Sequence, residues 1–380
     1  MRHRPGILKL LQRPGGAAQD IISEHDQIVI GYFVCLKPPA CDTRGGIGDK
    51  DVRRYLKHMC LRPSNSENPP DNGGRSWLST ITVTILVLMG LVYGTAARAT
   101  DEADNLRQKF AVLKPQLDNN QFQSPLHLNS VELDYSIRGD IYAVMDYPHA
   151  DISRALNDPE RGPASLCQIM MLHPNTKYCR VLNGKNGTIL NTKIGKKQEQ
   201  PLEEAYDMDF SYRNDGVPGN GYMRIELKSA AGPFSTKDYL IMIRVVGVDA
   251  NRSFLHLSYS LGYGFAARTA IKVYLATIGR DKVGFTRLDN PPGAEPRYIR
   301  GLRGVVERNT MRYYLAIEAF LNSTYLPPDK QLSRRLTRWF DASEKYARQL
   351  HEVNRQDYLQ MKYDENQRLQ NLKEQADPKR

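Results

Sequence analysis

Val131-Glu-Leu-Asp-Tyr-Ser-Ile-Arg-Gly-Asp-Ile-Tyr-Ala-Val-Met145 is the stretch that decides the fold of this 380-residue chain. Every odd position in it is apolar or glycine, whereas charged and polar residues fill the even positions from Glu132 to Asp140. This alternation predicts a strand with one buried face. Fifteen residues exceed the usual length of a strand, so we expect this strand to bend, and Gly139 is the position where a bulge would fit.

Two short helices and an antiparallel meander follow this strand. Residues 150–157 and 163–172 have helical patterns and are separated by Asp158-Pro159. Extended runs then flank Asn183-Gly-Lys-Asn-Gly187, whose composition is typical of a hairpin turn. Together with the first strand, the extended runs predict a sheet of about seven strands. They cover residues 177–182, 188–194, 206–213, 223–228, 237–248 and 252–261.

Two helical patterns come after the meander. Residues 265–278 are apolar nearly all round and are followed by Gly279, a typical residue after a helix C-terminus, so we expect this helix to be buried. Residues 298–307 have an extended pattern. A second helix is expected to begin near Thr310 and to reach Leu321, before a proline pair ends it.

The order of these elements over residues 131–321 resembles the helix-grip fold of START-like domains. The resemblance implies an α+β fold in which a bent antiparallel sheet of about seven strands wraps around a C-terminal helix. Either of the two predicted helices could be the gripped one. Three runs are also similar to uncharacterised exported bacterial proteins with no assigned activity. They are Phe254-Leu-His-Leu-Ser-Tyr-Ser, Gly279-Arg-Asp-Lys-Val-Gly-Phe-Thr and Glu307-Arg-Asn-Thr-Met-Arg-Tyr-Tyr.

The START-like resemblance implies a cavity between sheet and helix for a lipid, a sterol or another apolar or amphipathic small molecule. The alternative is a filled core without a ligand, since the helix can occupy the whole concave side. The strand alternation predicts which side chains face that side and would bind the ligand. They are Leu133, Tyr135, Ile137, Met208, Phe210, Ile225, Leu227, Leu255, Leu257 and Tyr259.

Several arginines near Glu307 offer a second kind of contact. Either they form a structural ion-pair network with Glu307, or one of them, Arg303, binds the acidic head of a ligand. Glu307 itself favours the structural interpretation. The arginines are Arg300, Arg303, Arg308 and Arg312.

The uncharged run at residues 76–97 indicates export. Arg75 precedes it, and the small residues Ala97 and Ala99 are what signal peptidase needs, so cleavage would expose Thr100. An uncleaved membrane anchor is the main alternative and a buried core helix the weaker one. A cleaved signal and an uncleaved anchor both predict a location in the bacterial cell envelope. A membrane contact through residues 76–97 is expected if the segment stays attached.

The expected organisation has five parts. Residues 1–75 are rich in Gly and Pro, which indicates disorder or a start codon placed too early; a cytoplasmic tail is the alternative. Residues 76–99 are the signal or anchor, and residues 130–326 are the START-like domain. Between them, residues 100–129 are a linker, in which the pattern predicts a short helix at 103–113 that Pro115 ends. Residues 327–380 form a charged helical extension that packs on the domain, self-associates or binds a protein partner.

The exported part contains two cysteines, Cys167 and Cys179, and an oxidising compartment favours a disulfide between them. Two buried thiols are one alternative. A metal site with His173 is another, although a closed zinc site needs a fourth ligand. The sequence therefore predicts the disulfide and no metal.

No nucleophile elbow, zinc-protease motif or phosphate-binding loop is present in the sequence, so we expect no cofactor and no catalytic residue, and enzymatic activity stays an open third possibility. His256 is the one histidine inside a clear strand, and we expect it to be structural. The net charge is +11 overall, but from Thr100 onward 40 basic and 34 acidic residues leave only +6, a mild excess. Export also argues against a nucleic-acid partner. The sequence thus favours an envelope protein that binds an apolar small molecule, with a structural or interaction protein as the alternative.

Overall fold

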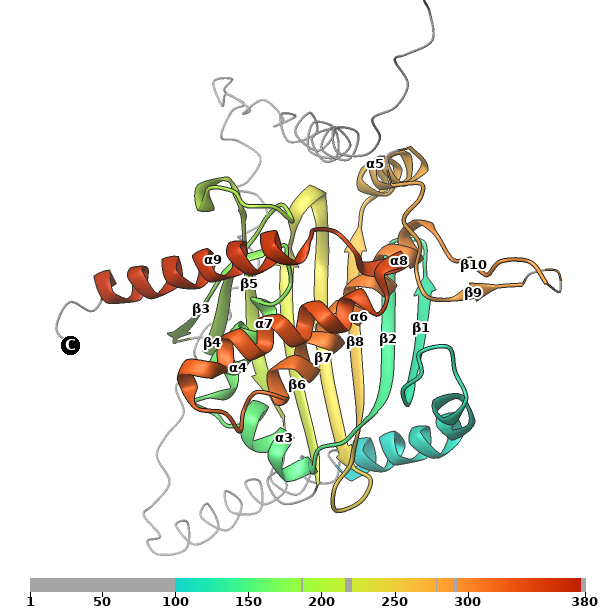
Figure 1. Ribbon diagram of the computed structural model, residues 1–380, viewed down its shortest axis with the longest axis horizontal. Helices are drawn as coiled ribbons and strands as arrows, with labels where there is room; N and C mark the ends of the chain where they lie inside the picture. The colour runs from blue at the N-terminus through green and yellow to red at the C-terminus, as the bar shows by residue number, and fades with distance from the viewer. Residues whose placement is uncertain are drawn as a thin grey trace, which may run out of the picture.

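The computed structural model describes residues 100–376, apart from residues 186, 216–220, 278, 290 and 292. At its centre is an antiparallel sheet of eight strands in the order β1-β2-β8-β7-β6-β5-β4-β3 (Figure 1). The predicted leader at 1–75 and the predicted signal or anchor at 76–99 lie outside the described residues. The strands are β1 (Leu126–Glu132), β2 (Ser136–Met145), β3 (Thr176–Gly184), β4 (Gly187–Ile194), β5 (Tyr206–Asn214), β6 (Tyr222–Ala231), β7 (Thr236–Gly247) and β8 (Ser253–Tyr263).

Helices precede, interrupt and follow the sheet along the chain. Residues 100–118 form the first helix of the described part. A small hairpin of β9 (Arg287–Leu288) and β10 (Arg297–Tyr298) lies between α5 and α6. The remaining helices are α3 (His149–Leu156), α4 (Gly162–Met170), α5 (Phe265–Ala276), α6 (Gly301–Leu321), α7 (Pro328–Glu344), α8 (Ala347–Leu350) and α9 (Arg355–Ala376).

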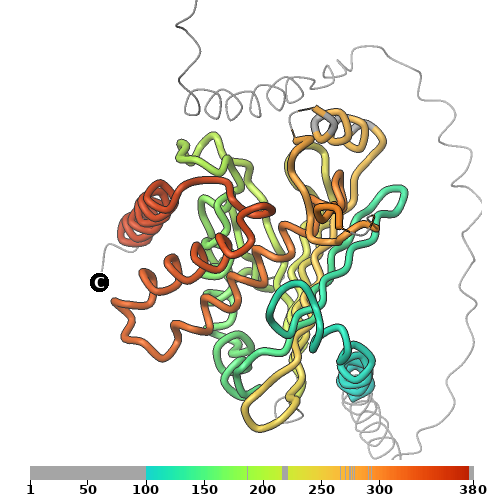
Figure 2. The backbone as a smooth tube through the Cα atoms, turned by 45° about the vertical axis from the view of Figure 1, so that its right-hand side comes forward, coloured from blue at the N-terminus to red at the C-terminus, as the bar shows by residue number. Residues whose placement is uncertain are grey.

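The two faces of the sheet carry different layers. The inner face, which includes Ile141 and Leu257, packs against α4 and α6 in one hydrophobic core. The outer face, which includes Phe254, packs against the helix at 100–118. Figure 2 shows the C-terminal helices on one side of the sheet and the helix at 100–118 on the other. The predicted α+β class, with an antiparallel sheet gripping a helix, is confirmed.

The first predicted strand is in fact a hairpin. Residues 131–145 divide between β1 and β2, and the backbone NH of Leu133 donates to the carbonyl of Ser136 at 2.9 Å across the turn. The alternation of apolar and polar residues continues through this turn, and the turn contains no glycine. The sequence pattern therefore gave no signal that the strand is interrupted here. As a result, β1 adds an eighth strand at the edge of the sheet, next to β2.

The gripped helix is α6 (Gly301–Leu321), and its first third, residues 301–307, was wrongly predicted to be extended. Gly301 has a φ of 69°, which lets the chain turn from the extended Arg300 into the helix. Gly304 lies close to the backbone of Gly284, because a Cβ there would come within 3.2 Å of the Gly284 nitrogen. Glycine and valine have low helix propensity, which is why the sequence pattern around Gly301, Gly304 and Val305-Val306 did not predict a helix. Tight packing in the folded protein outweighs this propensity.

Helix α5 is placed differently from the prediction. We expected a buried helix, but Phe265 is 77% exposed and Val273 58% exposed. Among the described side chains of α5, Ala267 is buried in the core and the half-buried Ile271 and Leu275 pack against it. The apolar composition of α5 predicts a helix with an apolar surface. It does not predict whether another part of the same chain packs against that surface.

Residues 100–129 were predicted as a linker with a short helix at 103–113 that Pro115 would end, and residues 100–118 instead form one continuous helix. Pro115 lies inside it, and its carbonyl still accepts from the backbone NH of Asn119 at 3.1 Å. Leu106, Leu113 and Leu117 bury their side chains against the outer face of the sheet. This packing compensates for the hydrogen bond that a proline removes.

The C-terminal extension is helical, as predicted, and its described part packs back on the domain. Helices α7 and α9 meet through stacked rings of Trp339 and Tyr358, whose centroids are 4.9 Å apart. Tyr358 also donates to the carbonyl of Leu172 at 2.8 Å. No helix among residues 100–376 is both long enough and apolar enough to cross a membrane.

Candidate functional site

The sheet brings most of the predicted ligand-binding side chains together on the inner face. Eight of them lie in the hydrophobic core and are at most 6% exposed. Leu133 and Tyr135 do not, because the turn between β1 and β2 leaves them 61% and 64% exposed at the end of the sheet. Their predicted orientation is therefore wrong. The eight buried residues are Ile137, Met208, Phe210, Ile225, Leu227, Leu255, Leu257 and Tyr259.

The described residues enclose a small cavity inside the grip. A cavity between the sheet, α4 and α6 has a volume of only about 10 Å³, and its exposed lining is entirely apolar. Leu227 and Leu257 line it from the sheet, Met170 from α4 and Ile317 from α6. A cavity of this size has room for about one water molecule, whereas small-molecule sites usually measure roughly 300–1,000 Å³.

Three tyrosines and a histidine form an aromatic cluster at one side of this core. The ring centroid of Tyr313 on α6 lies 5.6 Å from that of Tyr259 and 5.2 Å from that of His173, and Tyr239 lies 6.3 Å from Tyr259. Burial raises the pKa of Tyr259 well above its ordinary value. Burial, together with nearby cations, lowers the pKa of His173 well below its ordinary value. The cluster is therefore uncharged near neutral pH.

A second cluster places three cations on one largely buried carboxylate, Glu352. Its oxygens lie 2.7 Å from Lys197 Nζ, 3.2 Å from Lys282 Nζ and 2.7 Å from Arg312 Nη2. Burial alone would raise the pKa of Glu352, but these three cations hold it far below its usual value. Burial and the two other cations lower the pKa of Lys197. Sequence analysis missed this cluster, because its members come from four distant segments.

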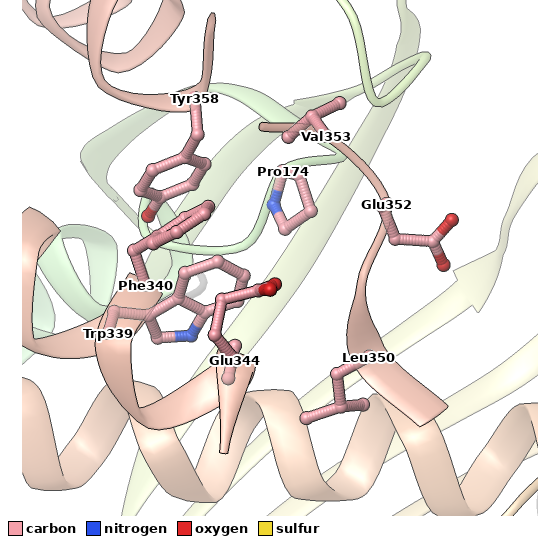
Figure 3. Close-up of a pocket in the computed structure, with 9 residues that line it drawn as sticks. Pro174, Trp339, Phe340, Glu344, Leu350, Glu352, Val353 and Tyr358 are labelled. Atoms are coloured by element: carbon pink, nitrogen blue, oxygen red, sulfur yellow. The ribbon is translucent and has the colours of Figure 1, made fainter. Parts of the chain in front are cut away.

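The helical extension contains a small aromatic pocket, shown in Figure 3. Trp339, Phe340 and Tyr358 lie on one side of it, and Leu350 and Val353 lie on the other (Figure 3). Its open volume is about 10 Å³, as small as that of the core cavity. The rings already contact one another, so the pocket is the seam between α7 and α9 and offers no room for a ligand in this conformation.

The arginines near Glu307 do not converge on one point. Glu307 is fully buried and accepts from the backbone NH groups of Phe285 and Thr286 at 2.6 and 2.9 Å. Its other oxygen accepts from the hydroxyls of Ser130 and Thr286, each at 2.6 Å. Arg303 donates to Ser130 Oγ at 2.9 Å, while Arg308 donates to a carbonyl of the loop after α5. This arrangement fastens that loop to α6 and favours the structural interpretation.

His256 lies on the outer face in a chain of charged groups. Arg244 Nη2 lies 2.6 Å from its Nδ1, and an arginine can only donate, so Nδ1 accepts. Its Nε2 must then carry the proton and donate to Asp140 at 2.8 Å. Burial lowers the pKa of His256 despite this carboxylate. Both ring nitrogens are occupied, which supports the predicted structural role.

Cys167 on α4 and Cys179 on β3 form a disulfide, as predicted, with their Cα atoms 5.3 Å apart. The bond joins α4 to the strand at the far edge of the sheet. Within the described ranges, no three His, Cys, Asp or Glu side chains are grouped so that they could hold a metal ion.

Comparison with known proteins finds similar solved structures at low sequence identity. No family profile and no curated protein matches the sequence. The structure is similar to a norcoclaurine synthase point mutant from Thalictrum flavum, with 15% identity over 39% of this chain and 89% of that chain, at a TM-score of 0.28. It is also similar to Ara h 8.0201, with 11% identity over 52% of this chain and 99% of that chain, at a TM-score of 0.28.

A third similar structure is the ZhuI aromatase/cyclase from Streptomyces sp. R1128, with 12% identity over 40% of this chain and 88% of that chain, at a TM-score of 0.25. Likenesses this low carry no argument about activity or ligand. The sheet order and the position of α6 define the helix-grip fold independently of them.

Proposed function

We propose that this protein is a structural or interaction protein of the bacterial cell envelope, with a helix-grip domain that serves as a solid support. The observation that carries the proposal is the volume of about 10 Å³ left between the sheet, α4 and α6. Leu166, Ile169 and Met170 of α4 line this small space. The interior is packed like the core of a protein without a ligand.

The proposed location rests on the sequence and on the disulfide. Disulfides persist in oxidising compartments, which agrees with export through the apolar run at residues 76–97. Cleavage after Ala99 would leave Thr100 at the N-terminus. N-terminal sequencing of the protein from isolated envelopes tests this, and a chain that still carries residues 76–97 would replace the signal with an anchor.

The proposed partner surface is the outer half of α9. The inner half is used for packing, because Tyr358 and Met361 are buried. The C-terminal end of α9 extends past the sheet (Figure 1), and Leu372 near this end is 39% exposed. A protein partner could therefore contact the exposed C-terminal end of α9, whereas the buried N-terminal half of the helix is not accessible to it.

The experiment that tests the proposal is mass spectrometry of small molecules retained by the purified full-length protein, together with titration by a fluorescent fatty acid. We expect no retained lipid and no uptake of the probe. A stoichiometric lipid would contradict the solid-core proposal.

An apolar or amphipathic ligand is the second candidate, favoured by the wholly apolar lining of the core cavity. In this case α4 and α6 would have to separate for the ligand to enter. Leu257→Trp distinguishes the two candidates. In a solid core the larger ring should destabilise by about 1–3 kcal/mol with no uptake to lose, whereas in a ligand site it should abolish uptake at little cost in stability.

A further inference from the structure

Glu352 is shared by more positive charge than one carboxylate can neutralise. Lys197 Nζ, Lys282 Nζ and Arg312 Nη2 lie 2.7, 3.2 and 2.7 Å from its oxygens. When both lysines are protonated, three cations and one carboxylate leave two positive charges in excess. Like charges this close repel one another strongly in a partly buried site.

Other acidic residues on the segments around the cluster contact groups outside it, so they do not balance this excess. Three of them pair with a basic residue that is not part of the cluster, one accepts from backbone NH groups, and one is exposed. They are Asp281 with Arg280 at 3.7 Å, Glu204 with Lys196 at 3.8 Å, Glu344 with His351 at 3.0 Å, Glu307 with the NH groups of Phe285 and Thr286, and the exposed Glu199.

A second group of buried charges beside the cluster is also net positive. Lys177 and Lys362 share the carboxylate of Glu365, at 3.0 and 2.8 Å, and all three side chains are at most 3% exposed. The two groups are adjacent, because Lys177 Nζ donates to the carbonyl of Gln198, the residue after Lys197, at 2.9 Å. Excess buried positive charge is costly, and a bound anion would lower that cost.

The cluster can be reached from solvent through its two lysines. Their side chains are 26% and 31% exposed, whereas that of Arg312 is 3% exposed. Among the described residues, Glu352 is the one ion-pair partner of Lys197, so the ammonium group of this lysine retains donors for a ligand. Arg312 Nε is buried without a hydrogen-bond partner in the described part of the chain. Figure 3 shows the Glu352 carboxylate directed away from the aromatic pocket, so the cluster is separate from that seam.

The two lysines lie on loops whose backbone is held in place. The loop after β4 carries the first, and Asn175 Nδ2 donates to the carbonyl of Gly195 in this loop at 2.6 Å. The loop after α5 carries the second, and Arg308 Nη1 donates to the carbonyl of Val283 in this loop at 3.1 Å. Cations on a fixed backbone need little reorganisation to bind a ligand.

We propose that Lys197, Lys282 and Arg312 form a binding site for a phosphate group or another small dianionic oxyanion. One dianion neutralises the two excess charges, and Glu352 holds the cations together when no anion is bound. Lysine and arginine are the usual partners of phosphate oxygens in proteins. This inference does not depend on the function proposed above.

Proton uptake should accompany binding. Burial, reinforced by Lys282 and Arg312 and opposed by Glu352, lowers the pKa of Lys197 to about 7. A dianion beside the ammonium group raises this pKa again, so the protein should take up protons when it binds sulfate at about pH 7.5. Sulfate does not itself titrate near this pH. The uptake is measured by calorimetry in buffers with different enthalpies of ionisation.

Calorimetric titration of the full-length protein with inorganic phosphate, at constant ionic strength, tests the site. Lys197→Met should bind phosphate at least about tenfold more weakly and should lose the proton uptake with sulfate. It leaves Glu352 paired with two cations, so we expect it to fold, as urea denaturation will show. Lys196→Met is the matched control, because this neighbouring lysine contacts Glu204 instead, and it should bind as the wild type does.

Glu352→Gln gives an opposite prediction. Removing the carboxylate increases the positive charge of the site, so this variant should bind phosphate about fivefold more tightly. Glycerol 3-phosphate identifies the source of the group, since tighter binding than that of inorganic phosphate indicates a phosphate ester and weaker binding indicates free phosphate.

Two results would overturn the proposal. One is that the wild type binds neither phosphate nor sulfate at millimolar concentration, in which case the cluster is a structural ion-pair network. The other is that Lys196→Met and Lys197→Met bind equally well, in which case the anion is held by basic residues elsewhere in the chain.

Discussion

Gly139 on β2 lies directly against Thr310 on α6, so that a Cβ at Gly139 would come to 2.5 Å from Thr310 Oγ1. The absence of a side chain lets the sheet close on the gripped helix at this point. We therefore expect Gly139→Ala to reduce the free energy of unfolding by about 1–3 kcal/mol, measured by urea denaturation. Gly184→Ala is the control, since its Cβ would meet nothing closer than 3.9 Å, and it should have little effect.

A double-mutant cycle isolates this contact. Thr310→Ala removes the oxygen that the new methyl group would meet, so Gly139→Ala should cost less in that background. Equal costs in both backgrounds would show that Gly139 is required for another reason.

The disulfide between Cys167 and Cys179 should contribute measurably to stability. It closes a loop with a sequence separation of 12 residues. The chain-entropy estimate for such a loop is about 3 kcal/mol. The double variant Cys167→Ala/Cys179→Ala should lose about this much free energy of unfolding, and reductant should then have no further effect on its melting temperature. A wild type that is insensitive to reductant in denaturant would contradict the prediction.

Most strands of the sheet could be predicted because apolar residues on the inner face alternate with more polar residues on the other face. Met223, Ile225 and Leu227 on β6, for example, alternate with polar residues and all face the core. The turn between β1 and β2 could not be predicted, because Leu133 and Tyr135 continue the alternation at positions that lie outside the sheet. The two-residue period of the apolar pattern cannot by itself distinguish a buried apolar residue in a strand from an apolar residue exposed at a turn.

The candidate site was predictable only as a list of inward-facing residues. The orientation of Leu257 follows from strand alternation, but the volume beside it depends on how closely α4 approaches, and that is a property of tertiary packing. Two other buried lysines, Lys177 and Lys362, could not be predicted for a different reason. Lys177 and Lys362 look like surface residues in sequence, since lysine is seldom buried without a partner.

Glu318 on α6 should make stability depend on pH. Burial, reinforced by Asp146 and opposed by Tyr314 and Arg338, raises the pKa of Glu318 from 4.5 to about 7. Between these values the folded protein holds a proton that the unfolded chain has lost, so stability falls as the pH rises through this window and stays reduced above it. Glu318→Gln replaces the titrating carboxyl group with an uncharged amide, so it should remove this pH dependence of stability.

We expect Glu318→Gln to be about 1–2 kcal/mol more stable than the wild type at pH 8 and nearly equal to it at pH 4, measured by urea denaturation. The control is Glu199→Gln, which alters an exposed carboxylate in the loop between β4 and β5. A difference between Glu318→Gln and the wild type that does not change with pH would contradict the raised pKa.

The last prediction concerns Glu365 on α9, which neutralises two buried lysines. Its oxygens lie 3.0 Å from Lys177 Nζ on β3 and 2.8 Å from Lys362 Nζ, and all three side chains are at most 3% exposed. Glu365→Ala would leave both ammonium groups buried without a carboxylate. Removing one member of a buried charge network usually costs about 3–5 kcal/mol, so this variant should unfold at lower urea concentration and release α9 to protease.

Two further variants show whether the charge balance is the cause. Lys362→Met keeps one lysine paired with Glu365, so it should cost less than Glu365→Ala even though it removes hydrogen bonds to the carbonyls of His173 and Thr176. Glu374→Ala, in the exposed outer part of α9, should leave stability and protease resistance unchanged. If Glu365→Ala and Glu374→Ala behave alike, or if protease removes α9 from the wild type, the helix is not held by this network, and the extension would be free to bind a partner along its whole length.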